Sequence, residues 1–266
     1  MQILQQGASG PDVIKVQTAL KNAGFPTGVI DGNFGPATEA ALLGFQKSKG
    51  LLADGQVDAP TATALGLDAA SVPPPAAMPN ITINIVSKMF PFTHLDNINK
   101  NLPFVLDALK AANLTDLPIV LTALGTIRAE TEAFVPLSEG ISRFNTSPGG
   151  HPFDLYDNRS DLGNNGPPDG ASFKGRGFVQ LTGRVNYAHF GPIVSVPNLT
   201  ETPDQANDPA VASRILAAFI ASKRLHIQDA LQRGDLAGAR RLVNGGSNGL
   251  DRFSEAYKTG LSLLSN

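Results

Sequence analysis

A proline-rich stretch divides the chain and limits how it can fold. Residues 66–80 read GLDAASVPPPAAMPN, with three consecutive prolines among mostly small residues. Proline lacks the backbone N–H that a helix interior needs, and runs of proline favour an extended, semi-stiff chain. We therefore expect one domain over residues 1–67, a linker over residues 68–82 and a second domain over residues 83–266. A chain of 266 residues is long enough for two separate cores.

The composition excludes several classes of function. The net charge is −2 and no long basic run occurs, so nucleic acid is not expected as a partner, because phosphate binding needs a positive surface. The chain has no cysteine, which excludes disulfides, thiolate zinc sites and a cysteine nucleophile. The four histidines show no His-x-x-x-His spacing. We expect neither a metal nor a cofactor.

The N-terminus and the apolar runs bear on where the protein is made. The sequence MQILQQGASG has no basic segment followed by an apolar one, so we expect synthesis in the cytoplasm without a signal peptide. No apolar run reaches the ~18 residues that cross a bilayer, so membrane insertion is not expected. We also expect a monomer, since nothing in the sequence argues against one.

The first domain contains a weak internal repeat. DGNFGPAT at residues 31–38 recurs as DGQVDAPT at residues 54–61, and each copy joins an Asp-Gly turn to a proline that opens a helix. An apolar periodicity predicts a preceding helix over residues 9–24, with Ser9 as its N-cap. We expect a compact three-helix unit.

The second domain is also predicted to be helical, which makes the fold class mainly α. Asn101, Thr115 and Asp208 are candidate N-caps of three helices, the last running over residues 209–226. Two more helices are expected after Asp235 and over residues 251–264. Residues 137–175 are rich in Gly, Pro, Asn, Asp and Ser, and a segment of this kind inside a compact domain is usually functional or disordered.

Three glutamates lie in or just after an apolar helix predicted to end near Phe134, ahead of Pro136. Glu130 falls on the shoulder of the buried face, where desolvation and the negative end of the helix dipole disfavour its charged form, as a general acid requires. Glu132 lies one turn from Arg128 and is expected to form a surface ion pair. Glu139 follows in a loop, where a carboxylate stays ionised. The pattern predicts an acid/base pair, but a solvated or capping role for Glu130 explains it as well.

A second unusual segment, FKGRGFVQLTGRVNY, covers residues 173–187. Its alternating polar and apolar residues predict a short strand that presents Gln180 and Thr182 on one face. On pattern alone, a hairpin with a solvated face is equally compatible.

This segment resembles the signature of family 19 glycoside hydrolases, the plant-type chitinases and related phage endolysins. The pattern Gly-Arg-Gly-x-x-Gln-Leu-Thr followed by Asn-Tyr is carried by Gly175, Arg176, Gly177, Gln180, Leu181, Thr182, Asn186 and Tyr187. The resemblance implies a lysozyme-like α-helical catalytic domain with a small strand and loop region lining the cleft. It also implies that Gln180, Asn186, Tyr187 and Arg176 serve substrate binding and that Thr182 helps position water.

The same family carries a His-Glu-Thr-Gly-Gly-Phe element, which is AETEAF here, so that Glu130 matches the general acid while Ala129 replaces the histidine. Glu139 occupies the endolysin-type position for the second carboxylate, with Asp154 and Asp157 as alternatives. Near the C-terminus, RRLVNGGSNGLDRF is similar to the family's Asn-Gly-Gly element. This implies a sugar-contacting Asn244 and a buried Arg252.

The first domain resembles the type 1 peptidoglycan-binding domain. The residues that carry this likeness, and that we expect to serve cell-wall binding, are Asp31, Gly32, Phe34, Gly35, Asp54 and Gly55.

Together the resemblances imply an endolysin-type peptidoglycan hydrolase that acts on the cell wall after release. It would cleave β-1,4 bonds between N-acetylmuramic acid and N-acetylglucosamine, as a muramidase. As an inverting enzyme it would hold its two carboxylates ~6.5–9.5 Å apart. Two alternatives remain open: a chitinase, and a non-catalytic wall-binding protein.

Overall fold

The computed structural model describes residues 4–51, 53–67, 77–244 and 248–265, without the side chains of residues 59, 225 and 244. The chain forms two compact units, Met1–Ala76 and Ala77–Asn266. Most of the predicted linker, residues 68–76, lies outside the described residues. Within the described ranges no strand is formed, so the predicted mainly α fold is confirmed. No helix there is long and apolar enough to cross a bilayer.

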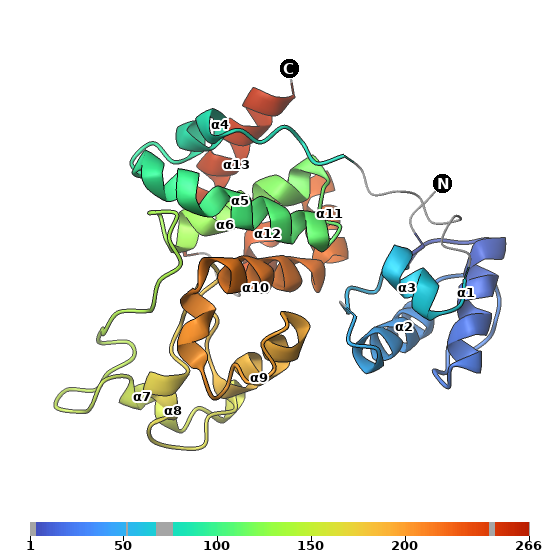
Figure 1. Ribbon diagram of the computed structural model, residues 1–266, viewed down its shortest axis with the longest axis horizontal. Coiled ribbons are helices and arrows are strands. Elements are labelled where there is room, and N and C mark those ends of the chain that lie inside the picture. Colours follow the sequence, from blue (N-terminus) through green and yellow to red (C-terminus); the bar gives the residue numbers. More distant parts are fainter. Residues whose placement is uncertain (1–3, 52, 68–76, 245–247, 266) are drawn as a thin grey trace. The chain divides into compact units, whose positions relative to one another are not determined.

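The first unit is built from α1 (Pro11–Asn22), α2 (Pro36–Ser48) and α3 (Ala59–Ala64), as predicted (Figure 1). A proline lies in the first turn of each helix, where its missing N–H costs no hydrogen bond. Apolar side chains from α1 and α2, including Val16 and Phe45, form the core. The N-cap prediction was wrong, because Gly10 precedes α1 and the backbone of Ser9 pairs instead with Asn33.

The repeat noticed in the sequence is a repeated hydrogen-bond network. Gln17 is buried on α1, and its amide nitrogen donates to Asp31 at 3.1 Å and to Thr38 at 3.1 Å. Its carbonyl oxygen accepts from the backbone N–H of Gly32 at 2.9 Å. One glutamine thus ties the Asp-Gly turn to the start of the next helix.

The second copy repeats the network around Gln46 on α2. Its amide nitrogen donates to Asp54 at 2.9 Å and to Thr61 at 3.3 Å, and its oxygen accepts from the N–H of Gly55 at 3.0 Å. Gly32 and Gly55 both have a φ of +73°, a conformation that glycine adopts without strain. The two halves of the unit therefore close their turns in the same way.

The second unit surrounds one central helix. Helix α6 (Leu117–Glu130) is contacted by α10, α11, α12 and α13, and it is buried from Ile119 to Ala129. Helix α10 lies between this bundle and the part of the unit that holds α9 (Figure 1). The remaining elements are α4 (Ile83–Met89), α5 (Leu95–Ala111), α7 (Asp154–Asp157), η2 (Ser160–Leu162), α8 (Asp169–Ser172), α9 (Arg184–Ile193), η3 (Pro203–Asn207), α10 (Pro209–Ala221), α11 (Arg224–Gln232), α12 (Leu236–Asn244) and α13 (Leu250–Leu264).

Tertiary contacts changed several predicted helix ends. Asp208 caps α10 as expected, with its carboxylate accepting from two backbone N–H groups. Asn101 is not a cap, since α5 begins at Leu95, and Asp116 rather than Thr115 precedes α6. The predicted helix over 209–226 is two helices. The break is followed by the buried Arg224, which donates to the carbonyl of Asn113 at 3.0 Å and so anchors the start of α11 to the loop before α6.

Helix α6 ends at Glu130, four residues earlier than predicted. Glu132 and Phe134 have positive φ angles of 48° and 56°, which interrupt the helix before Pro136. Phe134 is buried 4.8 Å from the ring of Phe90, and its carbonyl accepts from Asn101 at 2.9 Å. Packing of Phe134, rather than the proline, therefore ends the helix.

The predicted strand around Val179 is absent. Arg176 and Leu181 form an isolated antiparallel bridge, and the residues between them make a tight turn in which Gln180 has a φ of 52°. The alternation of polar and apolar residues reflects a turn with one buried side rather than an extended strand.

The network in the first unit makes a stability prediction. Replacing Gln46 by Leu leaves the N–H of Gly55 and the carboxylate of Asp54 without this buried partner, which we expect to destabilise the unit by about 1–3 kcal/mol. The first unit has no tyrosine or tryptophan, so hydrogen exchange read by mass spectrometry is the suitable measurement. Exchange over residues 54–61 should accelerate, whereas the exposed control Lys47→Ala should leave it unchanged. Equal exchange in both variants would contradict the assigned role.

Candidate functional site

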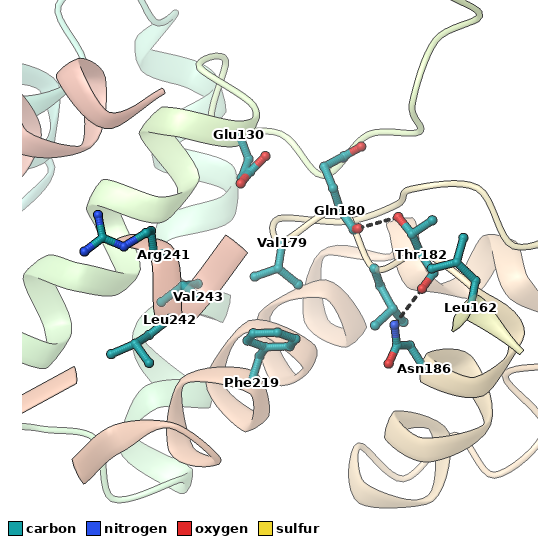
Figure 2. A pocket seen from close by; sticks show the side chains of 11 residues that line it. Glu130, Leu162, Val179, Gln180, Thr182, Asn186, Phe219, Arg241, Leu242 and Val243 are labelled. Carbon is teal, nitrogen blue, oxygen red and sulfur yellow. Dashed lines mark hydrogen bonds between the residues drawn. The ribbon is translucent and has the colours of Figure 1, made fainter. Parts of the chain in front are cut away.

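A pocket of about 420 Å³ lies in the second unit where α6, α9, α10 and α12 approach the turn at residues 176–181. Glu130 borders it from the end of α6, and Figure 2 shows its carboxylate pointing into the space above Val179. Gln180, Thr182 and Asn186 lie on the opposite side (Figure 2). The other lining residues are Leu162, Val179, Leu181, Phe219, Arg241, Leu242 and Val243. A carboxylate thus faces amide and hydroxyl groups across a partly apolar pocket.

Glu130 is held by a buried cation. Its Oε1 accepts from Nη2 of Arg240 on α12 at 2.6 Å, and the side chains of Glu130 and Arg240 are 14% and 1% exposed. The same guanidinium donates to the carbonyl of Asn248 at 2.9 Å. The sequence did not reveal Arg240, because a pair of adjacent arginines on a helix does not show which one turns inward. Its positive charge offsets the negative end of the α6 dipole.

Glu132 forms the predicted ion pair with Arg128, but the Arg128 side chain is buried rather than on the surface. The two charged groups lie 2.6 Å apart, and this bond is the main cause that lowers the pKa of Glu132 below its usual value. Arg252 also reaches Glu132, at 3.0 Å, and its side chain is 45% exposed. The expectation of a buried Arg252 was therefore wrong, and Arg240 is the buried arginine at the site.

Glu139 lies in the loop after α6 and is held by three donors. Asn145 donates to its Oε1 at 3.0 Å and the Tyr156 hydroxyl does so at 2.9 Å, while the N–H of Gly175 donates to Oε2 at 3.2 Å. Burial of Tyr156, together with its bond to Glu139, raises the pKa of this hydroxyl to about 12, so it remains a donor. Sequence reasoning missed Asn145 and Tyr156, which lie in the irregular segment 137–175.

Gly175 brings the loop carboxylate close to the turn. A Cβ at this position would lie 2.8 Å from Oε1 of Gln180 and 3.3 Å from both Oε2 of Glu139 and Oγ1 of Thr182. These three polar groups therefore converge on one small region, which only glycine leaves open. The amide nitrogen of Gln180 donates to the carbonyls of Leu137 and Gly177, at 3.0 and 3.1 Å, and so helps to fasten the turn.

Two of the predicted substrate-binding residues are buried. Tyr187 is 0% exposed, and its hydroxyl accepts from Arg176 at 3.0 Å and donates to the carbonyl of Lys174 at 2.9 Å. Burial raises the pKa of Tyr187 to about 12. Arg176 is 3% exposed and also pairs with Asp204 at 2.8 Å. The prediction that Arg176 and Tyr187 contact substrate is thus corrected, because both are packed beneath the turn and position it.

The two predicted sugar-binding asparagines are Asn186 and Asn244. Asn186 lines the pocket, and its amide nitrogen donates to the carbonyl of Thr182 at 2.7 Å. The side-chain oxygen of Asn186 can accept a hydrogen bond from a hydroxyl or an amide N–H of a ligand. Asn244 is the last residue of α12, and its side chain lies outside the described residues.

The alternative second carboxylates are engaged in holding the loop together. Asp154 accepts from both the hydroxyl and the N–H of Ser147, and these bonds lower its pKa. Asp157 is 2% exposed and accepts from the N–H of Gly170 at 2.8 Å and contacts His151 at 3.1 Å. Glu139 differs from both in lying beside Gly175, where a Cβ would also meet the side chains of Gln180 and Thr182.

The predicted wall-binding residues of the first unit mainly build that unit. Phe34 is 2% exposed in the core, and Gly35 precedes α2 as its N-cap. Asp31 accepts from the N–H of Asn33, which is the largest cause of its lowered pKa, and Asp54 is bound by Gln46. Phe34 therefore belongs to the core of the first unit.

Among the residues described, no group of three His, Asp or Glu side chains is arranged to hold a metal ion. The polar side chains that line the pocket are those of Glu130, Gln180, Thr182, Asn186 and Arg241.

Comparison with known proteins identifies the first unit. Residues 9–65 match the family described as a putative peptidoglycan binding domain. The match covers α1, α2 and α3 and both copies of the glutamine network. It leaves the second unit, with the pocket, unassigned.

Several curated relatives align with this chain over a segment about as long as the matched binding domain. The chain is 52% identical over 60 residues to a spore cortex-lytic enzyme of Bacillus cereus, covering 23% of each. It is 48% identical over 46 residues to the N-acetylmuramoyl-L-alanine amidase CwlM of Mycobacterium tuberculosis, covering 17% of this chain and 11% of that protein. It is 50% identical over 56 residues to a zinc D-Ala-D-Ala carboxypeptidase of Streptomyces albus G, covering 20% and 21%. The chain thus spans less than a quarter of the length of each of these relatives.

Two solved structures are similar at low identity. Chitinase C from Streptomyces griseus HUT6037 is 17% identical, with a TM-score of 0.47 over 70% of this chain and 77% of that chain. A Burkholderia AP3 phage endolysin is 16% identical, with a TM-score of 0.27 over 98% and 100%.

The ion pair between Arg240 and Glu130 makes a stability prediction. Arg240→Met removes the donors that Glu130 and the carbonyl of Asn248 share, so we expect a loss of about 3 kcal/mol. Urea unfolding followed by the tyrosine bands of the near-ultraviolet circular dichroism spectrum reports on the second unit, since all three tyrosines lie there and the chain has no tryptophan. The exposed neighbour Arg241→Ala is the control, with an expected change under about 0.5 kcal/mol.

A double-mutant cycle isolates the pair. Combined with Glu130→Gln, Arg240→Met should show a coupling energy of about 1–3 kcal/mol. Strictly additive losses would mean that the two side chains stabilise the unit independently.

Proposed function

We propose that the chain hydrolyses peptidoglycan as a muramidase, cleaving the β-1,4 bond between N-acetylmuramic acid and N-acetylglucosamine. The observation that carries this is the position of Glu130, which ends the buried helix α6 at a pocket lined by Gln180, Thr182 and Asn186. Amide and hydroxyl side chains suit N-acetylated sugars, because they offer donors and acceptors without net charge.

In the proposed reaction, Glu130 donates a proton to the glycosidic oxygen as the bond to the anomeric carbon breaks. Glu139 accepts a proton from a water molecule whose oxygen attacks the anomeric carbon from the other face. The hydroxyl of Thr182 donates to the carbonyl of Gln180 at 2.8 Å, which leaves its oxygen to accept a hydrogen bond from that water. The products are two shorter glycans. Glu139 then releases its proton to solvent, and Glu130 takes up a proton from solvent, which returns both carboxyl groups to their starting states.

The substrate is inferred from the first unit. Residues 9–65 match a putative peptidoglycan binding domain, and several relatives are named for enzymes of the cell wall. Attachment of a hydrolase to its insoluble substrate raises the effective local concentration of cleavable bonds. Peptidoglycan is therefore favoured over chitin as the polymer that this pocket meets.

The role of Glu130 is tested by Glu130→Gln, which keeps the shape of the side chain and removes the transferable proton. We expect the release of reducing ends from purified peptidoglycan to fall by at least about 1000-fold. Glu132→Gln, two residues further along, is the matched control and should retain activity within about twofold.

Product analysis by mass spectrometry separates the alternatives. Reducing N-acetylmuramic acid ends support the muramidase, and faster release of chito-oligosaccharides would identify a chitinase. Binding to sacculi without any reducing ends would identify a non-catalytic wall-binding protein. Full activity of Glu130→Gln in a folded protein would refute the proposed acid.

The second carboxylate is tested by comparing Glu139→Gln with Asp154→Asn. We expect Glu139→Gln to lower kcat by about 100-fold or more, because it removes the group that activates water. Asp154→Asn should alter kcat far less, since its carboxylate bonds Ser147 in the loop. Azide offers a further measurement, because a small anion can replace a lost general base and restore turnover to Glu139→Gln. The reverse ranking of the two variants would transfer the role to Asp154.

A further inference from the structure

The pocket next to Glu130 continues into a second pocket. A cavity of about 500 Å³ between α11 and α12 shares Arg241 and Leu242 with the first pocket. Figure 2 shows Arg241 on the side of the first pocket opposite Gln180 and Asn186. The side chain of Arg241 therefore borders both pockets.

The second pocket is charged where the first is mainly uncharged. Its lining includes His226, Asp229, Arg233, Asp235 and Arg241. Arg233 and Asp229 are one turn apart on α11 and are bonded to each other. This pair neutralises itself, which leaves Arg241 as the other guanidinium of the lining and Asp235 as the other carboxylate.

Arg241 is exposed and only weakly engaged. Its side chain is 58% exposed and lies 3.9 Å from Asp235, at the outer limit of an ion pair. Asp235 uses its other carboxylate oxygen to accept from the N–H of Gly238 at 2.7 Å, in the first turn of α12. The adjacent Arg240 is buried, and its guanidinium donates to Glu130 and to the carbonyl of Asn248. Consecutive helix residues thus supply one arginine to the proposed acid and another to the pocket.

We propose that Arg241 binds a carboxylate of the stem peptide of peptidoglycan and makes the site select that polymer over uncharged amino-sugar chains. This inference rests on the proposed function and names its specificity determinant. Peptidoglycan differs from chitin in a lactyl group on alternate sugars that carries a short peptide with free carboxylates. A guanidinium at the junction of a glycan pocket and a second pocket matches that branched, anionic shape.

The test compares two substrates of the full chain: intact peptidoglycan and the same strands after an amidase has removed the stem peptides. We expect Arg241→Ala to lower kcat/KM on intact peptidoglycan about tenfold, mainly through KM, and to leave stripped strands within about twofold. Arg241→Lys should fall between, because it keeps the charge and loses the bidentate geometry. Lys110→Ala, which removes an exposed positive charge on α5, is the control and should change neither substrate.

Each outcome bears on one proposal. If the wild-type chain cleaves neither substrate, the muramidase function fails. If the wild type is active and Arg241→Ala is unaffected on both substrates, or equally impaired on both, stem-peptide recognition fails and the muramidase function stands. Equal impairment would indicate that Arg241 acts on the glycan or on the lactyl carboxylate that amidase digestion leaves behind. Rising salt from about 0.05 to 0.5 M should reduce the wild-type preference for intact peptidoglycan, because screening weakens an exposed charge pair.

Discussion

The complete burial of α6 determines where chemistry can occur in the second unit. Gly125 lets α13 approach so closely that a Cβ there would lie 3.0 Å from the ring of Phe253. Four helices contact α6, and its side chains are buried from Ile119 to Ala129. Glu130 is the residue at which the helix emerges, so packing of the whole bundle fixes the position of the proposed acid.

The two proposed catalytic carboxylates are placed by different physical means. Glu130 belongs to a rigid helix and is oriented by one buried arginine. Glu139 belongs to an irregular loop and is oriented by a tyrosine hydroxyl, an amide and a backbone N–H. The loop itself is fastened to the turn at residues 176–181 by Gln180 and by bonds between backbone groups, such as Glu139 N–H to the Gly175 carbonyl at 2.7 Å.

Both units use a buried polar side chain to satisfy the backbone of an irregular segment. Gln17 and Gln46 do so for the two Asp-Gly turns of the first unit. Arg176 does so in the second unit, where it donates to the carbonyl of Ser172 at 2.8 Å and contacts Tyr187. Buried backbone groups must find partners, and loops lack the regular ladders that supply them in helices and sheets. Residues that match a functional motif, such as Arg176 and Tyr187, can therefore serve structure rather than ligand contact.

The sequence by itself determined the mainly α fold, the three-helix first unit and its repeat, because proline positions and apolar periodicity act over a few residues. It also predicted the ion pair of Glu132 with Arg128, although Glu132 lies beyond the end of α6 rather than on the helix. Only the tertiary structure decided that α6 ends at Glu130, with Phe134 buried beyond it, that Arg240 rather than Arg252 is buried beside Glu130, and that the predicted strand is a turn. Each of these depends on contacts between residues far apart in the sequence, such as Asn101 with Phe134 and Arg240 with Glu130. A local sequence pattern contains no information about which distant residues come into contact.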